Sequence, residues 1–348
     1  MELPIRPPYA PMEALLVDEI PSGKEWQYEP KWDGFRCIAF KDGEEIELQS
    51  KNGQSLRRYF PELISALQGI RAKKFVIDGE IVIPADGTFS FDDLLQRIHP
   101  AESRIKKLSK EHPAKLIVFD LLVSADGSSL AAIALHERRR ALERFFSESV
   151  AQNESIELSP ATTRIKDAER WLQMAGRDLD GIIAKRRDLS YRSGERTGMQ
   201  KVKRLRTADC VVGGFRYASK GRAVGSLLLG LYDDGGLLHH VGFTSGFSQH
   251  ERKSLLEKLE ALISPPGFTG NAPGGPSRWS TERSTEWQPL KPKLVVEVQY
   301  DHFTGNRFRH GTKLLRWRPD KSPKSCSMDQ VKPVAKPISP KLPKAFLP

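Results

Sequence analysis

Lys31 lies in the segment Tyr28-Glu29-Pro30-Lys31-Trp32-Asp33-Gly34-Phe35-Arg36, where one lysine is set among side chains suited to holding a nucleotide. A lysine amine attacks phosphorus only when deprotonated, and an ordinary lysine, with a pKa of about 10.4, is almost wholly charged at pH 7. Desolvation, neighbouring cations or a divalent metal could each favour the nucleophilic form. The segment therefore predicts covalent chemistry at phosphate, although Asp33-Gly34 would also suit an ordinary turn after a strand.

Further segments with charged residues and glycines follow along the chain. They are Ser50-Lys51-Asn52-Gly53, Asp78-Gly79-Glu80, Val118-Phe119-Asp120-Leu121-Leu122, Asp180-Gly181-Ile182-Ile183-Ala184-Lys185, Lys201-Val202-Lys203 and Arg318-Pro319-Asp320-Lys321. In this order and spacing they resemble the motifs of the covalent nucleotidyltransferases, and most closely those of the ATP-dependent DNA ligases. The resemblance covers nearly the whole chain. Its first segment and the segment 316–321 are most similar to the short bacterial ligases of the LigC type and to the ligase module of LigD.

The bulk properties suit a protein with two domains and a polyanionic partner. A chain of 348 residues is too long for one ordinary core. The formal net charge of +11 and the isoelectric point near 9.5 favour nucleic acid, although a generic basic protein could have the same values. Three cysteines without a Cys-x-x-Cys motif indicate neither a disulfide framework nor a thiolate zinc site.

The chain contains no apolar stretch of the ~20 residues that a membrane span requires, and its first residues lack a signal-peptide core. We therefore expect no membrane association and a cytoplasmic location. The resemblance adds a bacterial origin and a place at the nucleoid.

The first part of the chain alternates between strand and helix patterns. Residues 35–41 and 45–49 flank Asp42-Gly43, which predicts a hairpin. Short apolar runs flank Asp78-Gly79-Glu80, residues 115–122 suit a buried strand, and residues 135–147 suit a helix. This mixture predicts an α+β fold with antiparallel sheets, which the resemblance makes a nucleotidyltransferase (adenylation) domain over residues 1–205.

After Lys203 the pattern changes to short strands separated by turns. With one helix at 249–263 and a later strand at 294–300, residues 206–325 suit an OB-fold β-barrel. The Gly/Pro/Ser/Thr-rich residues 264–287 are predicted to form a mobile loop. Residues 326–348 are expected to form a Pro/Lys-rich tail with too little apolar content to fold alone.

The resemblance assigns a role in nucleotide binding to several residues. Lys31 would be the nucleophile that carries AMP. Glu29 matches the position beside the adenine, Arg36 matches a contact to the ribose, and Phe119 matches the aromatic that stacks on the base. Each of these residues also has an ordinary structural explanation. For example, a phenylalanine inside a strand is usually part of the core.

Two carboxylates are the candidates for metal binding. Glu80 would accept a hydrogen bond from the ribose or help to hold the metal. Asp180 matches the metal ligand of the fourth motif, where hard oxygen ligands suit Mg²⁺ or Mn²⁺. Because ligases usually have glutamate there, the shorter aspartate leaves direct or water-mediated coordination open.

The remaining candidates are cations that would bind phosphate. Within the first domain they are Lys51, Arg196, Lys185, Lys201 and Lys203. Lys51 stands where the family has arginine, so it retains the charge but lacks the bidentate fork, and Met199 replaces the family's tryptophan.

In the barrel, Arg318 and Lys321 match the last motif. In the family this motif moves over the nucleotide and orients the pyrophosphate. A solvated charge cluster is the alternative.

The resemblance thus implies an ATP-dependent enzyme that seals nicks in duplex DNA in three steps through lysyl-AMP. It implies a minimal ligase without a separate N-terminal DNA-binding domain, acting as a monomer in DNA repair. Some bacterial relatives work with the end-binding protein Ku and a primase-polymerase, which are therefore the expected partners.

Three alternatives remain at this point. An RNA-capping guanylyltransferase shares Lys-x-Asp-Gly but uses GTP, and no phosphatase segment is present here. RNA ligases usually lack the C-terminal OB barrel. A non-catalytic OB-fold nucleic-acid-binding protein would not require Lys31, Glu80, Lys185 and Lys201 together.

Overall fold

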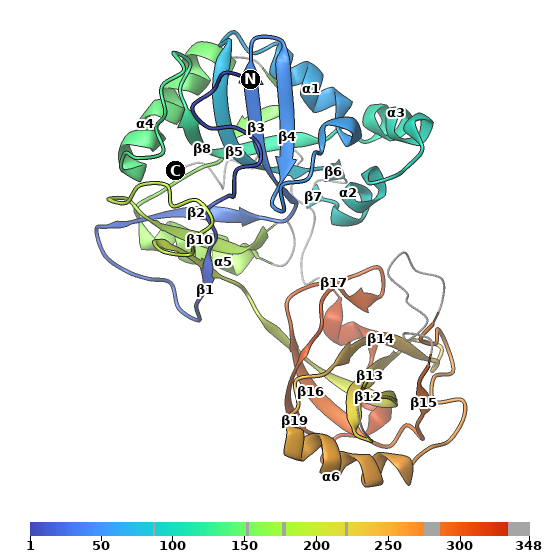
Figure 1. Ribbon diagram of the computed structural model, residues 1–348. Helices are drawn as coiled ribbons and strands as arrows, with labels where there is room; N and C mark the ends of the chain where they lie inside the picture. Colours follow the sequence, from blue (N-terminus) through green and yellow to red (C-terminus); the bar gives the residue numbers. More distant parts are fainter. Residues whose placement is uncertain (86–87, 151–152, 176–178, 220–221, 275–285, 333–348) are drawn as a thin grey trace. The chain divides into compact units, whose positions relative to one another are not determined.

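The computed structural model describes residues 1–348 except 86–87, 151–152, 176–178, 220–221, 275–285 and 333–348. The described chain forms two units, residues 1–204 and a second unit that starts at Leu205 (Figure 1). None of the helices in the described ranges is long and apolar enough to cross a membrane.

The larger sheet of the first unit has the strand order β4-β3-β5-β8-β9. Its strands are β3 (Phe35–Asp42), β4 (Glu45–Ser50), β5 (Lys74–Val82), β8 (Lys115–Val123) and β9 (Ile156–Leu158). All neighbours are antiparallel except β8 and β9. The β3–β4 hairpin confirms the prediction from Asp42-Gly43.

A second sheet of the same unit has the order β1-β11-β10-β2. It consists of β1 (Leu15–Leu16), β11 (Met199–Val202), β10 (Leu179–Arg186) and β2 (Trp26–Trp32). Asp33-Gly34 connects β2 directly to β3, so the chain passes from one sheet to the other beside Lys31. A Cβ atom at Gly34 would collide with the carbonyl oxygen of Ile81, so the tight crossing requires glycine.

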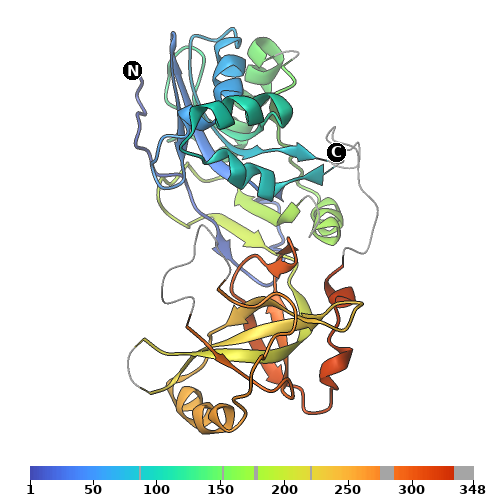
Figure 2. The same cartoon turned by 90° about the vertical axis from the view of Figure 1, so that its right-hand side faces the viewer.

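Helices cover the sheets of the first unit (Figures 1 and 2). They are α1 (Pro61–Gln68), α2 (Phe91–Arg97), α3 (Glu102–Glu111), α4 (Leu135–Phe145) and α5 (Ile165–Met174). The predicted helix 135–147 ends at Phe145, where a π-helical turn, Phe146–Val150, takes over. A short hairpin of β6 (Pro84–Ala85) and β7 (Thr88–Phe89) precedes α2.

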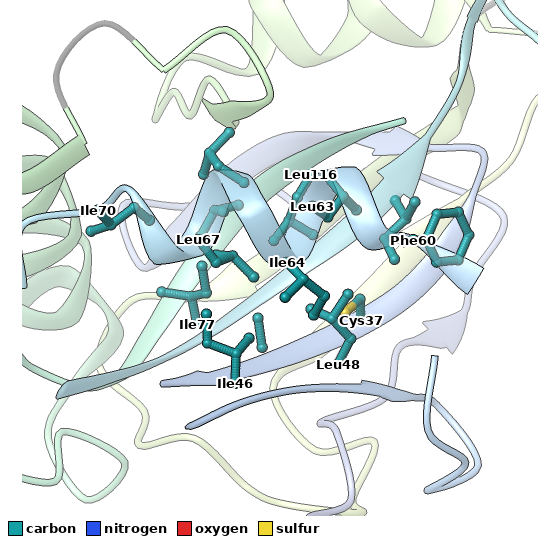
Figure 3. Packing of buried hydrophobic residues seen from close by; sticks show 14 of the residues in the cluster. Cys37, Ile46, Leu48, Phe60, Leu63, Ile64, Leu67, Ile70, Ile77 and Leu116 are labelled. Atoms are coloured by element: carbon teal, nitrogen blue, oxygen red, sulfur yellow. The ribbon is translucent and has the colours of Figure 1, made fainter. Parts of the chain in front are cut away.

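The helix α1 shows why the sequence folds in this way. Pro61 occupies the first turn, where its missing N–H is not needed, and Leu63, Ile64 and Leu67 recur at helical spacing. These side chains pack on the larger sheet against residues such as Leu48 (Figure 3). One hydrophobic core of this unit therefore lies between α1 and the sheet that carries Arg36 and Glu80, and another surrounds the second sheet.

The second unit contains a sheet with the order β14-β13-β12-β16-β19. Its strands are β12 (Arg206–Tyr217), β13 (Val224–Tyr232), β14 (Leu238–Thr244), β16 (Val295–Tyr300) and β19 (Lys313–Trp317); β15 (Gln288–Pro289) pairs with β12, and β17 (Phe303–Thr304) pairs with β18 (Arg307–Phe308). The helix α6 (Gln249–Glu260) lies between β14 and β16 in the chain, begins with a capping box of Ser248 and Glu251, and ends before residue 263.

The predicted OB-fold is confirmed, with one detail added by the strand pairing. Among the described residues, a single bridge between Thr244 and Thr312 joins the edges of the sheet near β14 and β19, so the hydrogen-bonded path is open. The strand order and the single helix are those of an OB-fold, which is a partly open barrel.

Two predicted flexible regions are only partly described. Of the predicted loop 264–287, residues 275–285 lie outside the described residues, and Phe268 is buried in the core of the second unit. Of the predicted tail, residues 333–348 lie outside the described residues. Cys326 and Val331 are buried in the same core, because two short 3₁₀ helices, Pro323–Ser325 and Met328–Val331, hold residues 323–331 on this unit.

Candidate active site

Lys31 lies near the end of β2, opposite Gly181 of the antiparallel strand β10. This register brings Asp180 next to the lysine. The Asp180 carboxylate forms ion pairs with Lys31 Nζ and with Lys203 Nζ, the latter at 3.0 Å. Asp180 is buried, whereas the side chain of Lys31 is 23% exposed. The lysine amine therefore has a carboxylate neighbour and remains accessible.

Arg36 of β3 and Glu80 of β5 lie opposite each other on one face of the larger sheet. Arg36 Nε and Nη2 donate to the two carboxylate oxygens of Asp78 at 2.6 and 2.7 Å, a bidentate ion pair. Burial raises the pKa of the Glu80 carboxyl to about 7, and the charges of Lys31 and Arg36 partly oppose this shift. Additional positive charge near Glu80 would help it to ionise.

The ring of Phe119 on β8 lies close to two cations. Arg36 Cζ and Lys185 Nζ are each 4.5 Å from the ring centroid. Lys185 Nζ also donates to Glu29 Oε2 at 2.7 Å, and Gln27 Nε2 donates to Glu29 Oε1 at 2.9 Å. Both members of this ion pair are buried, so each charge is compensated inside the protein.

These side chains line a single pocket. Its walls consist of Glu29, Pro30, Lys31, Trp32, Arg36, Glu80, Phe119, Ile183, Lys185 and Met199. The structure thus brings together six of the predicted site residues, and Asp180 joins them through its ion pair with Lys31. The pocket offers an aromatic face, several cations and two carboxylates, which suits a nucleotide with a metal ion.

Lys201 lies in β11, and Lys203 follows the last residue of that strand. The two lysines are separated by the buried Val202. Lys203 pairs with Asp180, as described above. Burial lowers the pKa of Lys201, and the positive charges of Lys31 and Lys203 lower it further. Lys201 therefore belongs to a region of concentrated positive charge around the nucleophile candidate. Lys185 is also paired with a carboxylate, that of Glu29, and its side chain is more deeply buried than that of Lys203.

Lys51 and Arg196 do not line this pocket. They share one carboxylate, that of Glu13, with Lys51 Nζ at 3.1 Å from Oε1 and Arg196 Nε at 3.2 Å from Oε2. The side chains of both cations are more than half exposed. The hydrogen bond from Lys51 and the two positive charges lower the pKa of Glu13.

Arg318 and Lys321 are described within the second unit. Arg318 Nη1 lies 3.0 Å from Asp209 Oδ1, and Lys321 Nζ lies 3.2 Å from Asp209 Oδ2. Arg318 also pairs with Asp320 at 2.8 Å. Both cations of the last motif are therefore bound to one carboxylate of β12.

A family model of the ATP dependent DNA ligase domain matches residues 11–203, and a model of the ATP dependent DNA ligase C terminal region matches residues 220–321. DNA ligase C2 of Mycolicibacterium smegmatis is 44% identical over 347 residues, which cover 95% of this chain and 96% of that protein. The chain belongs to the ATP-dependent DNA ligases. The resemblance found in the motifs is thereby confirmed, and so is the use of ATP.

Two further comparisons concern the fold and the wider family. The multifunctional non-homologous end joining DNA repair protein LigD of Mycobacterium tuberculosis is 29% identical over 304 residues, which cover 86% of this ligase and 37% of LigD. A solved structure of a Lig E DNA ligase has a TM-score of 0.53 and 18% identity, covering 88% of this ligase and 100% of that chain. The latter similarity shows a shared fold.

Some polar and charged partners in the ligase were not predicted from the sequence. They are Gln27, Asp78, Asp209, Glu13 and Tyr191. For Asp78 a signal was available, because it precedes Glu80 by two residues on one strand and therefore shares its face. Asp209 and Glu13 carry no such signal, since they lie far along the chain from the cations they bind.

Proposed function

We propose that Lys31 is the nucleophile of this ATP-dependent DNA ligase. Lys31 Nζ attacks the α-phosphorus of ATP, a phosphoramidate bond to AMP forms, and pyrophosphate leaves. The AMP then passes to the 5′-phosphate at a nick in duplex DNA, and the 3′-hydroxyl attacks that phosphate and expels AMP. The observation that supports this proposal is the accessible Lys31 amine in a pocket that also contains Phe119 and the carboxylate of Glu80.

The nucleoside would lie on the Phe119 side of the pocket. In this proposal the base stacks on Phe119, beside Glu29, and Arg36 contacts the ribose. Arg36 suits this role because Asp78 fixes its guanidinium group. Lys185 neutralises Glu29 and contacts the ring of Phe119.

Mg²⁺, or Mn²⁺ in its place, would be held by Asp180 and Glu80. Within the described ranges no cluster of three or more His, Cys, Asp or Glu side chains could hold a metal by itself. Two carboxylates nevertheless fit Mg²⁺, which is commonly bound by one or two carboxylates together with substrate phosphates. The raised pKa of Glu80 also fits, because a cation would stabilise its ionised form. When bound, the metal would neutralise charge on the phosphate oxygens.

The remaining cations would act on phosphate groups. We assign Lys201 and Lys203 to the phosphates near Lys31, and Lys51 and Arg196 to phosphate at the more exposed rim. Arg318 and Lys321 would orient the pyrophosphate during the first step. In each case the support is the positive charge and its partial exposure.

We further propose that the ligase acts as a monomer in bacterial DNA repair, in the cytoplasm and at the nucleoid. The printed name of LigD, a non-homologous end joining protein, supports a role in joining broken ends. In this proposal the ligase acts together with Ku and a primase-polymerase.

The decisive experiment compares Lys31→Ala with the unmodified ligase in the presence of α-labelled ATP and Mg²⁺. We expect no labelled adduct, because the only nucleophile is removed. Sealing of a pre-adenylated nick should survive in part. Lys74→Ala removes another ion-paired strand lysine at the far end of β5 and should leave adduct formation unchanged. A stable AMP adduct on the Lys31→Ala protein would refute the assignment.

A further inference from the structure

The N-terminal segment, defined here as residues 9–13, is joined to the β10–β11 loop, residues 187–198. Three hydrogen bonds connect the two stretches: Glu13 N donates to Glu195 O at 2.8 Å, Gly194 N to Pro11 O at 3.3 Å, and Ser193 Oγ to Ala10 O at 2.7 Å. A fourth, from Met12 N to Tyr191 Oη at 2.9 Å, lies in the interior. The loop that connects two strands of the site is thus held against the start of the chain.

Tyr191 connects this junction to Arg36. Its hydroxyl donates to Asp78 Oδ2 at 2.6 Å, and the same oxygen accepts from Arg36 Nη2 at 2.7 Å. Tyr191 is 5% exposed and Asp78 is fully buried, so water does not compete for these hydrogen bonds. Arg36 Nη2 also approaches Met12 O at 3.4 Å. The guanidinium that lies over Phe119 is therefore oriented through a chain of buried partners.

We propose that Tyr191 is a positioning residue for ATP, which acts through Asp78 to hold the Arg36 guanidinium in the orientation that the ribose requires. This inference rests on the proposed contact between Arg36 and the ribose. Tyr191 itself does not line the pocket, so its influence on ATP must pass through Arg36.

The physical reason is the number of donors that one carboxylate accommodates. Arg36 supplies two N–H groups to Asp78, and the Tyr191 hydroxyl supplies a third donor from the β10–β11 loop, which restricts rotation of the carboxylate. Without the hydroxyl, Asp78 Oδ2 loses a donor and Met12 N–H loses its acceptor. The carboxylate can then rotate, and Arg36 rotates with it.

The aromatic ring of Tyr191 has separate supports, so Tyr191→Phe should remove the hydroxyl alone. Arg138 Cζ lies 5.7 Å from the ring centroid and is itself bound by Asp120 through two hydrogen bonds of 2.9 Å. The ring of Tyr9 stacks on it with a centroid distance of 6.2 Å. These contacts do not involve the hydroxyl group.

The test is a double-mutant cycle on the rate of lysyl-AMP formation as a function of ATP concentration. We expect Tyr191→Phe to raise the KM for ATP about tenfold or more, as the loss of a hydrogen bond to a charged group implies, with kcat within about twofold. In an Arg36→Ala background, Tyr191→Phe should produce no further increase in KM. A purely structural role would lower the active fraction and kcat without such dependence on Arg36.

Tyr28→Phe is the matched control, because Tyr28 is also a buried tyrosine and its hydroxyl donates to Pro21 O at 2.8 Å, away from Asp78. It should leave the KM for ATP unchanged. If Tyr191→Phe does not fold, Asp78→Asn keeps the shape of the side chain and should raise KM in the same manner, again only when Arg36 is present.

Two results would overturn the inference: an unchanged KM in Tyr191→Phe, or a KM increase that multiplies with that of Arg36→Ala. If Arg36→Ala alone leaves the KM for ATP unchanged, the proposed contact between Arg36 and the ribose is refuted. The proposed role of Tyr191, which depends on that contact, is then refuted as well. The assignment of Lys31 is tested separately by the loss of the adduct in Lys31→Ala.

Discussion

Glu80 and Asp180 are two carboxylates of one site in different surroundings. Asp180 has the ammonium groups of Lys31 and Lys203 as partners, whereas burial is the main influence on Glu80. Neighbouring positive charge stabilises an ionised carboxylate and desolvation destabilises it. The two groups should therefore respond differently to substitution.

Glu80→Gln should alter how the free energy of unfolding depends on pH. Because the pKa of Glu80 is raised from 4.5 to about 7, the folded state binds its proton more tightly than the unfolded state does. The stability from this group is present below pH 4.5 and is lost as the pH rises towards 7. Between pH 5 and pH 8 the unmodified ligase should lose about 2–3 kcal/mol relative to Glu80→Gln. Urea unfolding at both pH values, without metal, measures the difference.

A matched control for this experiment is Glu44→Gln, since Glu44 is exposed in the β3–β4 turn. Its pH dependence should follow that of the unmodified ligase. If the stability of Glu80→Gln depended on pH in the same way as that of the unmodified ligase, the raised pKa of Glu80 would be contradicted.

Asp180→Asn should impair the chemical step more than ATP binding. A carboxylate that holds a metal contributes most where charge develops on the phosphate, so we expect lysyl-AMP formation to slow about 100-fold while the KM for ATP changes little. A higher Mg²⁺ concentration should restore part of the rate. Adduct formation measured across a Mg²⁺ titration checks this, and an unchanged rate at every concentration would reduce Asp180 to a structural partner of Lys31 and Lys203.

At the scale of elements, the strand β10 brings together residues that a regular strand would separate. Asp180 and Lys185 are five positions apart, so strict alternation would place them on opposite faces of the sheet. The register of β10 against β2 shifts between Leu179 and Gly181, which is a β-bulge. Such a bulge redirects a side chain, and here Asp180 pairs with Lys31 on β2 while Lys185 pairs with Glu29 on the same strand.

Gly181→Ala should therefore damage both stability and activity. Gly181 has φ +141°, and a Cβ atom there would collide with the carbonyl oxygen of Val202 on β11. We expect a loss of about 2–4 kcal/mol in the free energy of unfolding, because strain and a steric clash coincide. Adenylylation should fall as well, since Asp180 and Lys203 flank this contact.

The control for this variant is Gly69→Ala, at the end of α1. Gly69 has φ −70°, and its nearest neighbour would lie 3.5 Å from the new Cβ atom. Urea unfolding should show little change for it. A Gly181→Ala protein as stable as the Gly69→Ala protein would show that β10 and β11 can separate at low cost.

At the scale of the whole molecule, the two units carry different parts of the proposed reaction. The first contains the pocket, and the second contains Arg318 and Lys321, bound to Asp209. If these cations orient pyrophosphate, they must leave Asp209 and approach the nucleotide in the first step only.

Replacing both Arg318 and Lys321 with alanine should therefore be selective for one step. Formation of lysyl-AMP from ATP should slow by about two orders of magnitude or more, whereas joining of a chemically pre-adenylated nick, which bypasses pyrophosphate, should be largely retained. Single-turnover assays of the two reactions measure the difference.

Lys313→Ala, an exposed lysine on the neighbouring strand β19, is the matched control and should leave both reactions unchanged. Equal losses in both assays for the double variant would assign Arg318 and Lys321 to folding or to DNA binding.

Much of the architecture follows from local patterns that act over short distances. The β3–β4 hairpin depends on Asp42-Gly43 between alternating strands, and α1 depends on apolar residues at helical spacing after a proline. The order of the charged motifs was enough to predict the ligase family. These features can be predicted because each depends on residues that are close in the sequence or on the residue types of the motifs.

Only the tertiary structure decided which charges meet. Glu13 joins Lys51 to Arg196, Asp78 joins Arg36 to Tyr191, and Asp209 joins Arg318 to Lys321. The sequence does not show which of its 44 acidic residues forms an ion pair with each of these cations. An ion pair requires proximity in space and no particular spacing along the chain. The bulge that turns Asp180 towards Lys31, and the open path of the second sheet, likewise depend on strand register, which arises only when the strands pair.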